Sequence, residues 1–145
     1  MESDRVERDI FIAAPLQRVW SLVSEPGWWV EDGGPRSVQG EGSRVVVKLA
    51  VGTYLVRLER SEPQHYIAFR WASAFPGEEP VAGKSTLIEF TLAEEAGGTR
   101  LRVVESGFAT LAAPAEVRRK EFEGNAHGWL EELGHAKQCA EGVRE

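Results

Sequence analysis

The chain has 145 residues, the length of one domain and enough to bury about 70% of the surface that its unfolded form exposes. Its 42% hydrophobic and 28% charged residues are not the composition of a disordered chain, and its apolar runs are too short for a membrane span. The net charge of −6 disfavours sequence-independent binding of nucleic acid, because binding to the phosphate backbone needs a concentrated positive surface. We therefore expect one globular domain, 1–145, that does not bind nucleic acid and does not span a membrane.

The start of the chain and its cysteine content indicate the compartment. Met1 is followed by Glu2 and further charged residues, which is not the order of a secretory signal. The single Cys139 cannot form an intrachain disulfide and has no motif neighbour, so we interpret it as an inert thiol. We expect a cytoplasmic protein.

Two short elements and a loop are predicted near the N-terminus. Alternation of apolar and polar residues predicts a strand over 5–13, and Pro15 opens a predicted helix over 16–24. The apolar stripe of this helix consists of Leu16, Val19, Trp20 and Val23. The many glycines and prolines that follow predict a loop as far as Gly42, with at most one further helical turn.

From residue 43 the hydrophobic period changes to two, which predicts antiparallel strands joined by short turns. The strands are expected at 43–51, 54–62, 65–72, 85–93 and 99–106. Turns are expected at Gly52–Thr53, at Glu62–Gln64 and at Ala96–Gly98, with a longer exposed loop over 73–84. The inner face of the sheet is assigned by alternation to Val56, Leu58, Ile67, Phe69, Trp71, Ile88, Phe90, Leu92, Leu101 and Val103.

The last predicted element, 114–141, is a single helix long enough to cover that apolar face. At 1.5 Å per residue it spans roughly 40 Å. Its apolar stripe, at alternating steps of four and three, consists of Phe122, Ala126, Trp129, Leu133, Ala136 and Ala140. The pattern predicts an α+β fold in which a curved antiparallel sheet wraps around a long C-terminal helix.

Four segments carry a resemblance to a known family: IFIAAPLQRVWSLVS (10–24), PQHYIAFRW (63–71), STLIEFTLAEEAGGTRLRVVESGF (85–108) and HGWLEELG (127–134). Together they resemble the family of the activator of the heat-shock protein 90 ATPase, within the START-like or polyketide-cyclase-like superfamily. The resemblance implies the helix-grip fold, with a hydrophobic cavity between sheet and helix that often holds a small apolar ligand. It does not imply one activity, because one fold hosts unrelated functions.

The candidate ligand-binding residues are inward side chains of the predicted sheet and helices, because ligand sites are mostly apolar clefts. They are Trp20, Val56, Leu58, Phe69, Trp71, Ile88, Phe90, Val103, Phe108, Trp129 and Leu133. The adjacent Trp28 and Trp29 point in different directions, so one could cover the core while the other borders the cleft. The alternative is that these rings simply fill the interior at crystal-like density.

Two further features concern the cavity. Gly124 and Gly128 lie inside the long helix, where each costs about 1 kcal/mol against alanine, so we expect either the close approach of another backbone or a ligand mouth at Gly128. Glu105 continues the inward parity of Leu101 and Val103 and could be a carboxylate at the cavity end. If dry, its pKa would rise and it could act as a general acid or base.

No metal or cofactor site is expected. His127, Glu131 and His135 share a helical stripe at i, i+4 and i+8, but that stripe lies opposite the buried face and lacks a fourth ligand. The sequence contains neither a Gly-x-Ser-x-Gly elbow nor a phosphate-cradling loop.

Three functional hypotheses follow. The first is a non-enzymatic domain that binds a small hydrophobic molecule between sheet and helix, in a cavity of about 300 Å³ or more. The second is a cyclase or dehydratase that uses Glu105 or an inward arginine on an apolar or aromatic substrate. The third is a co-chaperone-like domain that stimulates a heat-shock protein ATPase or binds another protein partner, through an exposed apolar patch around Trp28, Trp29 and Phe75. A homodimer is the other partner considered.

Overall fold

The computed structural model describes residues 4–30, 37–41, 44–49 and 52–142. Within these described residues, seven strands, two α-helices and one 3₁₀ helix follow one another. They are β1 (Arg5–Ile12), α1 (Leu16–Val23), β2 (Ser37–Glu41), β3 (Arg44–Leu49), β4 (Gly52–Glu62), β5 (Tyr66–Trp71), β6 (Thr86–Glu95), β7 (Gly98–Ser106), η1 (Phe108–Thr110) and α2 (Ala115–Glu141).

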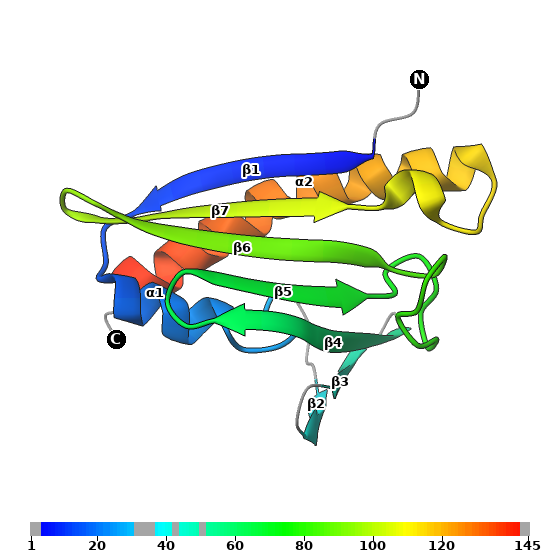
Figure 1. The fold of residues 1–145 in the computed structure, drawn as a ribbon, viewed down its shortest axis with the longest axis horizontal. Helices are drawn as coiled ribbons and strands as arrows, with labels where there is room; N and C mark the ends of the chain where they lie inside the picture. Colours follow the sequence, from blue (N-terminus) through cyan, green and yellow to red (C-terminus); the bar gives the residue numbers. More distant parts are fainter. Residues whose placement is uncertain (1–3, 31–36, 42–43, 50–51, 143–145) are drawn as a thin grey trace.

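All the strands form one antiparallel sheet in the order β1-β7-β6-β5-β4-β3-β2. The first strand closes one edge by pairing with the last, so that Val6 lies opposite Glu105. Figure 1 shows the sheet curving across the molecule, with α2 running obliquely behind it from the η1 end toward α1. This arrangement confirms the predicted α+β fold.

Helix α2 packs its apolar stripe against the concave side of the sheet. Trp129, Leu133, Ala136 and Ala140 are buried, while Phe122 and Ala126 are partly buried against the same core. At the C-terminal end of α2 the carboxylate of Glu141 accepts a hydrogen bond of 2.7 Å from the backbone N–H of Ala13. The end of the helix is thereby fixed to the segment between β1 and α1.

The alternation predicted for the strands is confirmed. Val56, Ile67, Phe69, Ile88, Phe90, Leu92, Leu101 and Val103 are all buried, whereas Leu58 and Trp71 are partly buried and pack against the same core. One irregularity lies in β4, where the register against β5 shifts between Leu58 and Arg60. Such a β-bulge bends the strand and supports the curvature of the sheet.

Two expectations about the loops are wrong. The glycine-rich segment before Gly42 contains strand β2, and its five residues pair in register with β3. Gly52 and Thr53 do not form a turn but begin β4, with Gly52 opposite Leu49, so the connection falls outside the described residues. Glycine is compatible with a strand at the edge of a sheet as well as with a turn. Both glycine-containing segments are strands here because they pair with β3.

The loop after α1 brings the tryptophan pair into the core. Gly27 has a φ of +77°, and a Cβ at this position would lie 2.9 Å from the Cγ2 atom of Val47. Only glycine allows the backbone to turn so close to β3. Trp28 and Trp29 are buried as a result, at 8% and 3% exposure.

In the part of the chain that the structure describes, neither α-helix combines the length and apolar character needed to cross a bilayer.

Candidate functional site

Aromatic side chains fill most of the space between α2 and the sheet. The ring centroids of Trp29 and Phe69 are 5.2 Å apart, those of Trp28 and Phe90 are 5.5 Å apart, and those of Phe90 and Trp129 are 5.7 Å apart. These are the separations of rings in direct contact. The interior is therefore largely occupied by the side chains expected to surround a ligand.

This packing concerns the residues that are predicted to line a cavity. Val56, Phe69, Ile88, Phe90 and Val103 are all fully buried. Phe108 and Leu133 also belong to the core, and the partly buried Leu58 and Trp20 pack against it. None of these residues is among those that line the pocket between α2 and the end of β5, so their role in binding a ligand stays a prediction.

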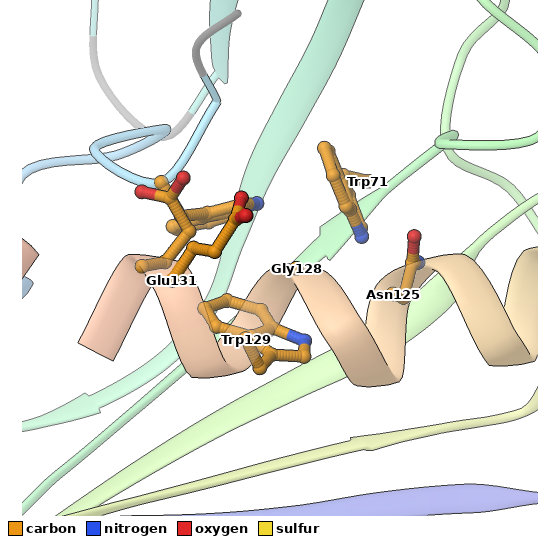
Figure 2. Close-up of a pocket in the computed structure, with 7 residues that line it drawn as sticks. Trp71, Asn125, Gly128, Trp129 and Glu131 are labelled. Carbon is orange, nitrogen blue, oxygen red and sulfur yellow. The ribbon is translucent and has the colours of Figure 1, made fainter. Parts of the chain in front are cut away.

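A smaller pocket of about 190 Å³ opens where α2 meets the loop after α1 and the end of β5. We call it the Trp pocket, and it is lined by Trp29, Trp71, Asn125, Gly128, Trp129, Glu131 and Glu132. Figure 2 shows the ring of Trp71 beside Asn125, with Gly128 between Asn125 and Glu131 along the helix. Asn125, Gly128, Trp129 and Glu132 follow the i, i+3, i+4, i+7 spacing of one helical face.

Beneath this pocket lies Glu105, a carboxylate with no exposed surface. Its Oε2 atom accepts hydrogen bonds from Nε1 of Trp71 at 2.8 Å and from Oγ1 of Thr86 at 2.5 Å. Its Oε1 atom accepts one from Nε1 of Trp129 at 2.8 Å, and Nδ2 of Asn125 lies 3.1 to 3.2 Å from both oxygens. Trp71, Asn125 and Trp129 also line the Trp pocket, so Glu105 connects its sheet wall to its helix wall.

Burial raises the pKa of Glu105 above its ordinary value, since removal from water disfavours the ionised form. The hydrogen bonds from Thr86, Trp71, Trp129 and Asn125 act in the opposite direction and partly offset the rise in pKa. The side chain of Glu105 is on the inner face, as the parity of its strand predicts, and it meets the condition of burial on which its raised pKa depended. Glu105 does not itself line the pocket, however, because the side chains that bind it cover it.

Two carboxylates stand at the pocket on α2. The side chain of Glu131 is 64% exposed and lies 3.4 Å from Nε2 of His127. The side chain of Glu132 is 14% exposed and lies 3.7 Å from Nδ1 of His135. In the described residues no group of three or more His, Cys, Asp or Glu side chains is arranged to hold a metal ion.

The glycines of α2 do not contact another backbone, which corrects the first of the two explanations proposed for them. A Cβ built on Gly124 or Gly128 would meet no heavy atom within 4 Å. Gly128 lines the Trp pocket, and the second explanation, a ligand mouth, stays a prediction.

Of the predicted site residues, Trp29, Trp71, Gly128 and Trp129 come together at the pocket. Sequence reasoning missed Asn125, Glu131 and Glu132. A helical face of polar and small residues directly beside the apolar stripe was the available signal for Asn125 and Glu132.

The apolar patch expected for a protein partner is not formed by Trp28, Trp29 and Phe75. Both tryptophans are buried, and Phe75 is partly buried against the core. The large hydrophobic residues exposed in the described part of the chain are Val81, Val117 and Leu130.

Comparisons with known proteins place this architecture among solved structures. The chain is similar to protein MLL2253 from Mesorhizobium loti, with 20% identity and a TM-score of 0.69 over 92% of this chain and 94% of that one. It is also similar to the Aha1 dimer from Colwellia psychrerythraea, with 17% identity and a TM-score of 0.72 over 99% of this chain and 100% of that one. DynU16, from the dynemicin biosynthetic locus, is 23% identical with a TM-score of 0.66, and the match covers 94% of this chain but 46% of DynU16.

At these identities the neighbours show the fold alone, and no curated protein sequence matches the chain significantly. The sequence model of the family described as "Activator of Hsp90 ATPase homolog 1-like protein" matches residues 13–140, which include α1, the whole of the sheet except β1, and nearly all of α2. The chain belongs to the family of Activator of Hsp90 ATPase homolog 1-like proteins.

Proposed function

We propose that this protein binds a small molecule in the Trp pocket. The observation that carries the proposal is the combination of a rigid wall and an open space. Three indole rings form the wall, and two of them are held by hydrogen bonds to the buried Glu105. The space lies over Gly128, where any side chain would project into the opening. Walls whose orientation is fixed before binding lower the cost of ordering on association.

The volume of the pocket bounds the size of the ligand. Sites for drug-sized molecules usually measure about 300–1,000 Å³. At about 190 Å³ the Trp pocket suits a smaller molecule, or one part of a larger molecule that extends past the exposed Glu131.

Reaction chemistry that uses Glu105 as the base has less support. Both oxygens of Glu105 already accept hydrogen bonds, and the side chain has no exposed surface through which a substrate could reach it. A general base must come within hydrogen-bond reach of the proton that it removes. Glu105 is better described as a positioning residue that holds Trp71, Asn125 and Trp129.

Obstruction of the pocket tests the proposal. We expect Gly128→Leu to abolish the chemical-shift changes that small-molecule fragments cause at the indole N–H signals of Trp71 and Trp129. The matched control is Gly124→Leu, which adds the same side chain to the same helix at a position with equally open space but outside the pocket. Fragments that bind the wild type and Gly128→Leu equally well would place the binding site elsewhere.

A further inference from the structure

We infer that the ligand of the Trp pocket is a small organic cation, an ammonium compound carried on an apolar or aromatic body. The inference rests on the proposed function and specifies its ligand class. It comes from the charge and the aromatic character of the residues that line the pocket.

The hydrogen-bond donors of the walls point inward. Nε1 of Trp71 and Nε1 of Trp129 are each 2.8 Å from an oxygen of Glu105, and Nδ2 of Asn125 lies between both of those oxygens. Nε1 of Trp29 is buried, so it is not presented at the pocket surface either. The indole donors are therefore withdrawn from the ligand, and the amide nitrogen of Asn125 is turned toward Glu105.

Acceptors remain at the pocket surface. Figure 2 shows the amide oxygen of Asn125 on the side away from the α2 backbone, because the amide nitrogen is turned toward Glu105. The exposed carboxylate of Glu131 also lies at the pocket, and the mostly buried Glu132 adds a second carboxylate to its lining. No lysine or arginine is among the described residues that line the pocket. A lining of acceptors and carboxylates matches a ligand that donates hydrogen bonds or carries positive charge.

The aromatic part of the lining favours the same ligand. The centroids of Trp29 and Trp71 are 5.7 Å apart with ring planes at 83°, and the centroids of Trp29 and Trp129 are 6.0 Å apart. Differently oriented indoles around one opening form part of an aromatic box. Tryptophan is the ring that attracts cations most strongly, and quaternary ammonium groups bind in sites of this kind.

Charged ligands and their neutral isosteres test the inference directly. The first pair is choline and 3,3-dimethylbutan-1-ol, which differ by exchange of the quaternary nitrogen for carbon. The second is 2-phenylethylammonium and 2-phenylethanol. We expect each cation to bind about fivefold tighter or more than its partner, measured by titration of the indole N–H signals. The affinity of the cations should fall as salt is added, and that of the alcohols should not.

The two carboxylates of the pocket provide the matched variants. We expect Glu131→Gln/Glu132→Gln to weaken binding of both cations several-fold and to leave both alcohols unchanged. The control Glu116→Gln/Glu123→Gln removes the same charge from exposed positions of α2 outside the pocket and should leave all four affinities unchanged. Glu131→Gln alone, at a side chain 64% exposed, guards against loss of folding in the double variant.

The outcomes distinguish failure of the cation inference from failure of the proposed function, the binding of a small molecule in the Trp pocket. Alcohols that bind as tightly as the cations, or cation binding that the pocket variants leave unchanged, would overturn the cation inference while the pocket still binds ligands. If neither these compounds nor the fragments perturb Trp71 and Trp129, the proposed function fails with it.

Discussion

Glu105 shows how one buried charge can organise a site that it does not enter. A carboxylate removed from water is costly unless hydrogen-bond donors replace the lost hydration. Trp71 from β5, Thr86 from β6, and Asn125 and Trp129 from α2 supply those donors. In return, Glu105 fixes the orientation of two indoles that would otherwise have buried N–H groups to satisfy. The carboxyl group of Glu105 therefore determines how the indole rings of the pocket wall are oriented.

Replacement of this carboxylate by an apolar side chain should be severe. We expect Glu105→Leu to lower the free energy of unfolding by at least about 3 kcal/mol, because several buried donors lose their acceptor at once. Urea denaturation measures the loss. Adding Thr86→Val to this variant should cost less than Thr86→Val costs in the wild type, since one unsatisfied donor disappears. A loss below about 1 kcal/mol for Glu105→Leu would show that the donors do not depend on Glu105.

At the scale of the element, α2 carries two functions on neighbouring faces. One face, with Trp129, Leu133 and Ala136, is buried against the sheet and accounts for the position of the helix. The adjacent face presents Asn125, Gly128 and Glu132 to the pocket. Trp129 contributes to both, because its ring packs on Phe90 while its N–H reaches Glu105.

The glycines of α2 weaken the helix without any steric need. We expect Gly124→Ala and Gly128→Ala each to raise the free energy of unfolding by up to about 1 kcal/mol, because alanine is the better helix former and its Cβ meets nothing within 4 Å. Thermal and urea unfolding measure the gain. Gly98→Ala should destabilise instead, since its Cβ would lie 2.1 Å from the backbone oxygen of Ile12. Destabilisation by Gly128→Ala would mean that the added Cβ meets atoms that the structure does not place within 4 Å of it.

Over the whole molecule, features that depend on periodicity were predictable and those that depend on volume were not. Alternation along β5 to β7 placed Phe69, Phe90 and Val103 in the core, and the parity of β7 placed Glu105 inside with them. The cavity expected between these residues stays a prediction, because no sequence pattern reveals whether rings touch or leave a gap. The edge strand β2 was missed, because its glycine and short length resemble those of a turn while its partner strand supplies the order.

The pKa of Glu105 makes the stability of the entire fold dependent on pH. The folded-state pKa lies above the ordinary value of 4.5, so between 4.5 and that raised pKa the folded protein binds more protons than the unfolded chain. The free energy of unfolding therefore falls as pH rises through this window. Exposed Glu79 and Glu141, whose pKa values are lowered, oppose this trend but titrate equally in a variant that lacks the Glu105 carboxyl. We accordingly expect the free energy of unfolding of the wild type, minus that of Glu105→Gln, to decline from pH 4.5 upward and then level off. Urea denaturation at a series of pH values measures this difference, and a difference that rises with pH would mean that the donors around Glu105 outweigh its burial.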